Sequence, residues 1–236
     1  MTPLPIDHVE LDRILNQLRT LAGGERCPAV LFTGATRGAG ASTLAWAVAQ
    51  RAVMSGQRVL FVDLDPLKPY TEQVLFLDLE TGPQPLEGVL TAPKTIPGRT
   101  LDVTRIRSWA GARRSGQKDG SLLAAELETL GASYDLIVAD GAPVAARRTS
   151  ATVDGCAVTA LFDVTYLAVA GAVTSAARLQ AATDRLTEMG GRIAGTVLNE
   201  REMELPFQGL SRRFRQLSAL LPWLPRLLGF RFRSVG

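Results

Sequence analysis

The fold of this chain is decided by the stretch Thr33-Gly-Ala-Thr-Arg-Gly-Ala-Gly-Ala-Ser-Thr43. A glycine-rich stretch of this kind follows a strand, opens a helix and presents backbone N–H groups to phosphate. The residues that we expect to bind a nucleotide are its second half: Gly38, Ala39, Gly40, Ala41, Ser42 and Thr43. A lysine ordinarily follows the last glycine, and a hydroxyl after it holds Mg²⁺. Here Ala41 replaces the lysine and Ser42 keeps the hydroxyl, so the phosphate cradle is present without its cation.

The missing lysine leaves two hypotheses. Either the chain binds ATP or ADP with Mg²⁺ weakly and acts by binding, or another residue such as Arg37 supplies the charge. Charge-assisted contacts to phosphate are worth roughly 1.5–3 kcal/mol each. One lost donor typically costs about 10²–10³ in rate. We therefore expect phosphotransfer to be weak or absent.

The composition limits the other classes of function. The 236 residues are 46% hydrophobic and 21% charged, which suits one α/β domain. Two cysteines, Cys27 and Cys156, are too few for a disulfide framework. A single histidine, His8, excludes a histidine-based triad or a multi-histidine metal site. Without an N-terminal signal peptide or an apolar run of ~18–20 residues, we expect a cytoplasmic protein.

The net charge of +3 is unevenly distributed. Residues 205–236 carry six arginines and no acidic residue, so residues 1–204 hold 20 basic and 23 acidic residues. We expect three parts: an N-terminal helix in 1–26, a nucleotide-binding domain in 27–204 and a basic amphipathic tail in 205–236. The tail either packs on the domain or contacts an anionic membrane surface or a partner. The residues that we expect at such a contact are Arg212, Arg213, Phe214, Arg215 and Trp223.

Hydrophobic periodicity predicts alternating strands and helices. We expect strands over 29–33, 58–63, 134–140, 164–169 and 192–199. Helices are predicted over 9–21, 42–54, 121–130, 149–162 and 174–189, the last with Thr174 or Ser175 as its cap. Residues 66–120 read mainly as loops, with a candidate extended segment at 101–106. This order indicates an α/β fold with a mostly parallel sheet and helices on both faces.

Polar residues gather where the predicted strands end. Besides the glycine loop, Asp63, Asp65, Asp140 and Asn199 all fall at or just after the carboxyl ends of strands. Ligands of parallel sheets bind at that edge. Asp63 and Asp65 are candidates to polarise a hydroxyl or to hold Mg²⁺ through water, and a loop carboxylate or a helix cap is the alternative. Asp140 ends an apolar strand, where an unpaired carboxylate is costly to bury. We predict that Ser42, Asp63 and Asp140 hold the metal.

Several motifs resemble one family. VLFTGATRGAGASTLAWAVAQ, RVLFVDLDPLKPY, YDLIVADGAPV, VDGCAVTALFD and GTVLN occur in the order found in the ATPase domain of the bacterial tyrosine kinases of polysaccharide biosynthesis. Those kinases are P-loop ATPases of the MinD/ParA type, and the resemblance covers about residues 9–200. It implies a nucleotide-binding fold of that type. It also implies catalytic roles for Asp63 and Asp65, with Asn199 near the adenine base. Arg37 stands where the family usually has proline, and its catalytic role belongs to the hypothesis that it replaces the lysine.

The chain also departs from that family. The lysine that marks the MinD/ParA branch would fall at Thr36, and Arg13 and Asn16 stand where the kinases have the Glu and Arg of their ring-forming helix. The kinases end in a tyrosine-rich tail, whereas the last tyrosine here is Tyr166. The resemblance with these departures predicts a kinase-derived pseudoenzyme that regulates synthesis and export of an exopolysaccharide, capsule or adhesive polysaccharide.

The predicted partner is a membrane polysaccharide co-polymerase, reached from the cytoplasm or from the inner face of the membrane. We expect no nucleic acid partner, and homo-oligomer formation stays open. Two alternatives remain at this stage: an active tyrosine kinase or ATPase that uses Arg37, and a positioning ATPase of the MinD/ParA type.

Overall fold

The computed structural model describes residues 8–22, 27–65, 69–79, 88–107, 119–144, 156–171 and 174–199. Seven strands form one sheet in the spatial order β3-β4-β2-β5-β1-β6-β7. Their bounds are β1 (Ala29–Gly34), β2 (Val59–Asp63), β3 (Lys94–Thr95), β4 (Leu101–Arg105), β5 (Leu136–Asp140), β6 (Val164–Ala170) and β7 (Ile193–Asn199). All neighbouring pairs are parallel except β3 with β4. The predicted α/β class with a mostly parallel sheet is confirmed.

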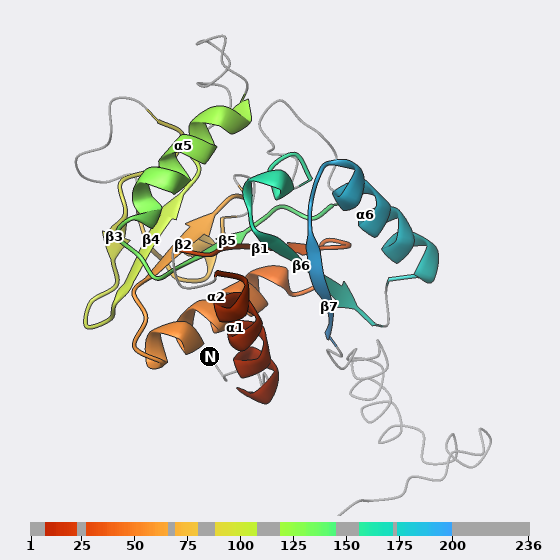
Figure 1. Ribbon diagram of the computed structural model, residues 1–236, viewed down its shortest axis with the longest axis horizontal. Helices are drawn as coiled ribbons and strands as arrows, with labels where there is room; N and C mark the ends of the chain where they lie inside the picture. The colour runs from red at the N-terminus through yellow and green to blue at the C-terminus, as the bar shows by residue number, and fades with distance from the viewer. Residues whose placement is uncertain are drawn as a thin grey trace, which may run out of the picture. The chain divides into compact units, whose positions relative to one another are not determined.

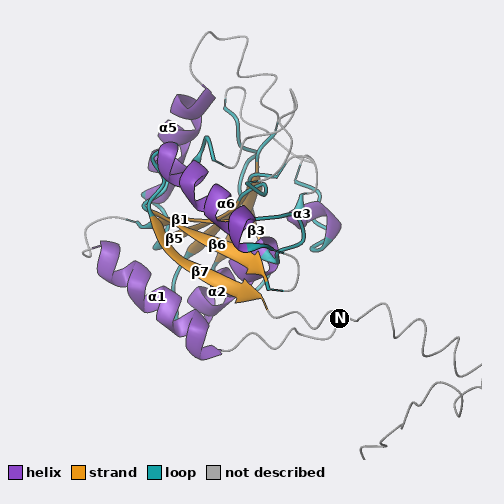
Figure 2. Ribbon diagram, turned by 90° about the vertical axis from the view of Figure 1, so that its right-hand side faces the viewer, coloured by secondary structure: helices purple, strands orange, loops and turns teal. Residues whose placement is uncertain are grey.

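Helices cover both faces of this sheet (Figures 1 and 2). They are α1 (His8–Ala22), α2 (Ala41–Met54), α3 (Tyr70–Gln73), α5 (Asp119–Gly131), the 3₁₀ helix η2 (Thr159–Leu161) and α6 (Ala176–Glu188). Successive strand residues point to opposite faces, so Phe32 packs with α1 and α2 whereas Leu31 packs with α5. The central strands are buried on both faces, which explains their continuous apolar sequences.

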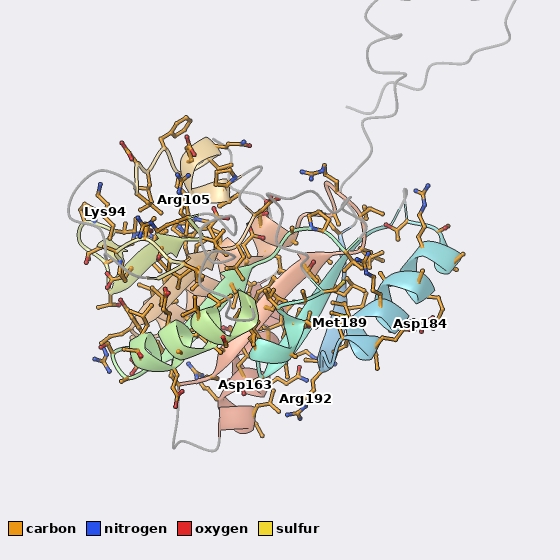
Figure 3. All side chains as sticks on the ribbon, turned by 90° about the horizontal axis from the view of Figure 1, so that it is seen from above. Lys94, Arg105, Asp163, Asp184, Met189 and Arg192 are labelled. Atoms are coloured by element: carbon orange, nitrogen blue, oxygen red, sulfur yellow. The ribbon has the colours of Figure 1, made fainter. Side chains whose placement is uncertain are left out.

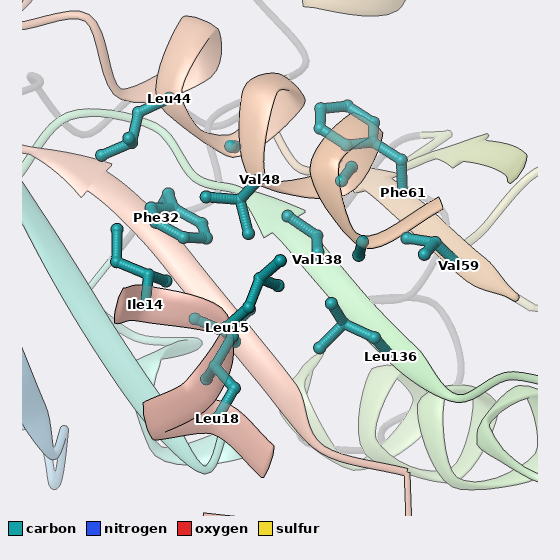
Figure 4. Close-up of a cluster of buried hydrophobic side chains, with 14 of the residues drawn as sticks. Ile14, Leu15, Leu18, Phe32, Leu44, Val48, Val59, Phe61, Leu136 and Val138 are labelled. Atoms are coloured by element: carbon teal, nitrogen blue, oxygen red, sulfur yellow. The ribbon is translucent and has the colours of Figure 1, made fainter. Parts of the chain in front are cut away.

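The N-terminal helix α1 belongs to the same core. Its buried face of Leu11, Ile14, Leu15 and Leu18 packs with α2 and the central strands (Figure 4). Arg51 of α2 donates from Nε and one terminal nitrogen to the carboxylate of Asp12, at 2.6 and 2.7 Å. By contacts, the chain divides into one unit of Met1–Asn199 and another of Glu200–Gly236.

Most predicted elements are confirmed, with two exceptions. The helix predicted over 149–162 is wrong for its described part, because residues 156–162 form a turn and the three-residue η2. The stretch 66–120, read mainly as loops, contains α3, β3, β4 and the start of α5. Ser175 is confirmed as the cap of α6, because its Oγ accepts from the N–H of Arg178 at 3.3 Å. In the described part of the chain, no helix is long and apolar enough to cross a membrane.

Candidate phosphate-binding site

The glycine loop connects β1 to α2, as its sequence predicts. Gly38 and Gly40 have φ values of 80° and 91°, which glycine adopts most readily. A Cβ on Gly40 would also collide with the side-chain amide of Asn199. The N–H of Ala39 donates to the carbonyl of Thr36 at 3.3 Å and closes the turn. The two glycines therefore fix a tight loop that leads directly into the helix.

The N-terminus of α2 is open to an anion. Gly40 is its N-cap residue, and no side chain caps the helix. Within the described ranges, no acceptor meets the N–H groups of Ala41, Ser42 or Thr43. The first N–H groups of a helix have no partner within it and carry the positive end of its dipole. This part of the predicted site therefore has the form that phosphate binding requires.

The alanine at the position of the missing lysine packs against its neighbours. Ala41 is 9% exposed and forms a small cluster with Ala39 and Ala168 of β6. Arg37, the proposed surrogate, is exposed. Its guanidinium makes no hydrogen bond or ion pair with any residue placed by the structure. The loop as it stands therefore has backbone donors but no fixed cation.

Asp140 is the most unusual carboxylate at this edge. It ends β5, is 1% exposed, and neither of its oxygens has a hydrogen-bond partner in the structure as described. Burial, followed by the charge of Asp63, raises its pKa well above the ordinary value. The hydroxyl of Ser42 lies close enough to lower this pKa, although its geometry falls short of a hydrogen bond. A cation bound between Ser42 and Asp140 would give the carboxylate a partner and would offset the free-energy cost of burying it.

Asp63 lies beside Asp140 but is already bonded. The two residues are register partners on β2 and β5. The Oδ2 atom of Asp63 accepts from the N–H and the hydroxyl of Thr71, at 2.9 and 2.8 Å, and Oδ1 accepts from the N–H of Asp65 at 3.2 Å. Burial raises the pKa of Asp63 to about 6, and the Thr71 donors oppose that shift. In this conformation Asp63 holds the start of α3 through Thr71. This arrangement corresponds to the alternative in which the aspartate acts as a helix cap.

The predicted metal set is therefore only partly assembled. Asp65 is 9% exposed and lies close enough to Asp140 for its charge to raise the pKa of Asp140. No group of three or more His, Cys, Asp and Glu side chains suited to a metal ion occurs in the ranges that the structure covers. Among the predicted ligands, the carboxylate oxygens of Asp140 have no hydrogen-bond partner in the described residues and lie near the Ser42 hydroxyl. Both carboxylate oxygens of Asp63, in contrast, already accept hydrogen bonds. A Mg²⁺ ion here would need phosphate or water oxygens as its remaining ligands.

The sequence did not single out Tyr70 as part of this site. Its ring packs near Trp46 and Phe61, at centroid distances of 6.3 and 6.4 Å. Its phenol lies beside the hydroxyl of Thr43, and burial, followed by the charge of Asp140, raises its pKa. The signal that could have found it is its place two residues after Lys68, in the segment that follows the aspartate pair.

A second contact holds α3 from the other side. Arg105, at the end of β4, donates to Glu72 of α3 at 2.7 Å.

Figure 3 shows Arg105 and Asp163 toward opposite edges of the molecule. At the other edge, Oδ2 of Asp163 accepts from the N–H of Ala29 at 2.9 Å and fixes the start of β1. This hydrogen bond accounts for Asp163 as a structural residue, and no role for it in the phosphate-binding site is needed.

Asn199 contacts the glycine loop. Its side-chain nitrogen donates to the carbonyl of Ala39 at 3.0 Å, and the same amide fills the space beside Gly40. The last residue of β7, which is separated from β1 by β6 in the sheet, therefore supports the loop through this hydrogen bond. The tail residues Arg212, Arg213, Phe214, Arg215 and Trp223 lie outside the described residues.

Comparison with known proteins supports the fold. No family model and no curated protein matches the chain. The kinase domain of the Escherichia coli tyrosine kinase ETK is similar with a TM-score of 0.62 and 21% identity, over 82% of this chain and 76% of that chain. The VpsO kinase domain gives 0.61 and 20%, over 81% and 93%. An Archaeoglobus fulgidus nucleotide-binding protein in complex with ADP gives 0.50 and 15%, over 89% and 84%.

These similarities, with the glycine loop between β1 and α2, define the class of fold. The chain has the P-loop fold of the MinD/ParA type. Among solved structures, it is similar to the kinase domains of bacterial tyrosine kinases. The resemblance seen in the sequence is confirmed at this level.

Proposed function

We propose that this protein is a kinase-derived nucleotide-binding regulator with weak or absent phosphotransfer. The observation that carries this proposal is the alanine at the lysine position of an otherwise open phosphate cradle. Ala41 is packed against Ala39 and Ala168, and the backbone donors at the start of α2 have no acceptor among the described residues. Such a loop offers hydrogen bonds to a bound phosphate but no cation to stabilise charge that develops during transfer.

The ligand is ATP or ADP, and the residues present fit a Mg²⁺ ion that accompanies it. The fit rests on Asp140, whose buried oxygens have no hydrogen-bond partner among the described residues and lie near the Ser42 hydroxyl. Ser42 and Asp140 would hold the ion, and Asp65 would face it through water. When bound, the ion neutralises phosphate charge. Asp63 would orient α3 through Thr71, and Asn199 would keep the loop in shape through Ala39.

The second candidate is an active kinase or ATPase that uses Arg37. The supporting observation is that this side chain is exposed and engaged by no described residue, so it is available to turn toward a phosphate. Arginine can contact phosphate with two donors at once. This candidate differs from the first by predicting turnover that Arg37→Ala removes.

We assign the pathway as exopolysaccharide, capsule or adhesive-polysaccharide synthesis and export, with a membrane co-polymerase as partner. The motif resemblance supports it, and so does the similarity to the ETK and VpsO kinase domains. A cytoplasmic or peripheral inner-membrane location goes with this assignment. A positioning ATPase of the MinD/ParA type is the remaining alternative, and it predicts nucleotide-dependent membrane cycling.

The test is a direct comparison of binding and turnover. Mg-nucleotide binding without hydrolysis or tyrosine phosphorylation would support the regulator, and turnover that requires Arg37 would replace it with the active kinase. The pathway is tested separately by deletion of the gene. Loss of surface polysaccharide that is restored equally by the natural chain and by Arg37→Ala would support the assignment, whereas unchanged polysaccharide would contradict it.

A further inference from the structure

The two edges of the sheet differ in how they are protected from other chains. β3, at one edge, has only two residues, begins with Lys94 and pairs antiparallel with β4. Short edge strands and edge lysines both prevent a sheet from pairing with another strand. β7, at the other edge, has seven residues, IAGTVLN, and none of them is charged or proline. One edge of this sheet therefore carries protection in its sequence, and the other does not.

The first part of β7 is closed by the chain itself. Its register with β6 is irregular, and Ala194 is the extra residue of the resulting bulge. The side-chain nitrogen of Gln17 on α1 also donates to the carbonyl of Ala194, at 3.5 Å. Bulges interrupt the pairing of an edge strand. Pairing with another strand is therefore confined to the second part of β7.

The second part of β7, from Thr196 to Asn199, is open. The carbonyl of Asn199 accepts from the N–H of Gly171, just after β6, at 3.2 Å. Because alternate residues of a strand direct their backbone groups to opposite sides, Thr196 and Leu198 direct theirs away from β6. The described residues offer these groups no partner. Both side chains are exposed, that of Leu198 by 55%. Figure 2 shows β7 at this edge, between α6 on one side and α1 on the other.

This open edge is complementary to itself. Two identical strands related by a twofold axis run antiparallel. An axis at Val197 places Thr196 of one copy opposite Leu198 of the other, and such pairs exchange N–H···O=C bonds in both directions. Arg192 precedes the strand, and residues 200–204 after it contain three acidic residues and one arginine. Antiparallel pairing therefore brings the basic end of one strand to the acidic end of the other, whereas parallel pairing would bring like charges together.

We propose that the open edge of β7 binds the same edge of a second copy of this chain, so that the two sheets join into one. Thr196 and Leu198, which form this interface, take no part in the phosphate cradle, so the interface and the proposed nucleotide function can be tested separately. Because the two β7 strands run in opposite directions, the carboxyl edges of the two sheets face opposite ways. The dimer therefore has two separate phosphate-binding sites rather than one site shared between copies.

Sedimentation velocity of the full chain over a range of concentrations tests the proposal, and the expected result is a monomer–dimer equilibrium. Thr196→Pro removes an N–H that faces away from β6, where an edge strand tolerates proline. The variant should fold and raise the Kd of the dimer about tenfold, because the twofold axis repeats the lost hydrogen bond. Thr196→Val keeps the N–H and should leave the Kd unchanged. A chain that stays monomeric up to millimolar concentration would overturn the proposal. So would a dimer that a folded Thr196→Pro variant leaves intact, since another surface, such as the tail 205–236, would then form it.

A disulfide at the twofold axis tests the geometry. Val197→Cys places one thiol of each copy at the axis, where the Cα atoms of a non-hydrogen-bonded antiparallel pair are about 4.5 Å apart, within disulfide range. Oxidation should give a covalent dimer in far higher yield than for Met54→Cys, the control at a side chain that is 73% exposed at the end of α2. Equal yields would indicate random collisions and contradict the proposal.

If Thr196→Pro does not fold, Leu198→Lys decides. The side chain is exposed, so a lysine is compatible with the fold of the single chain, and it gives β7 the protection that β3 already has. A weaker dimer supports the proposal, and an unchanged Kd contradicts it.

Discussion

The buried carboxylates predict an unusual dependence of stability on pH. Burial raises the pKa of Asp63 from the ordinary carboxyl value of 3.8 to about 6 in the folded protein. Between these values the folded state binds more protons than the unfolded state, so the free energy of unfolding falls as pH rises through 6. From pH 5 to pH 7, this one carboxyl lowers it by about 1.3 kcal/mol. Asp140, whose pKa is also raised, acts in the same direction.

Urea denaturation of the nucleotide-free chain at pH 5 and pH 7 measures this effect. In a thermal denaturation of a domain of this size, ~1.3 kcal/mol corresponds to a midpoint temperature about 3–5 °C higher at pH 5 than at pH 7. Asp63→Asn removes the titrating group and should shrink the difference between the two pH values by about 1.3 kcal/mol. Asp135→Asn is the control, because Arg58 lowers the pKa of Asp135 and keeps it charged over this range. A protein that loses stability at pH 5, or an Asp63→Asn variant with the full difference, would refute the reasoning.

Three further predictions concern other parts of the chain. Asn199→Ala should weaken ADP and GDP by a similar factor of about 5–10, because one hydrogen bond to the loop carbonyl is lost; fluorescence titration showing loss for ADP alone would favour contact with the base. With ATP the protein expressed alone should carry no stoichiometric phosphotyrosine by mass spectrometry, and phosphate on Tyr70, Tyr134 or Tyr166 that Asp63→Asn abolishes would contradict this. Truncation after Glu204 should leave a folded protein that no longer sediments with membranes, with salt weakening the attachment of the full chain as the Debye length falls from ~10 Å at 0.1 M to ~3 Å at 1 M; unfolding of the truncated chain would show that the tail belongs to the core, and continued sedimentation would place attachment in the domain.

Local patterns were enough to predict the sheet and the position of the site. The five continuous apolar strands and the glycine loop each have a single physical interpretation, and all of these elements occur in the structure. The convergence of Asp63, Asp140 and Asn199 at one edge follows from the parallel arrangement, since the carboxyl ends of parallel strands meet there. β4 was foreseen only as a candidate extended segment, because its alternation is short and lies in a stretch rich in Pro and Gly.

The details of the contacts depended on tertiary structure. No sequence pattern shows that Thr71 would occupy both lone-pair regions of one Asp63 oxygen, or that Asn199 would reach the carbonyl of Ala39. Tyr70 escaped notice because its ring is brought to Thr43 by the packing of α3 on Trp46 and Phe61. The predicted helix over 149–162 failed in its described part, where residues 156–162 turn tightly to place Asp163 at the start of β1.

The central claim is that this loop binds a nucleotide without turning it over. The most direct measurement is the rate of ATP hydrolysis at a Mg-ATP concentration at which calorimetry shows the site to be occupied. The account predicts a rate no greater than that of Asp140→Asn, in which the candidate metal ligand is removed. A rate clearly above that background, abolished by Asp140→Asn and by Arg37→Ala, would contradict the account and establish an active enzyme with an arginine in place of the lysine.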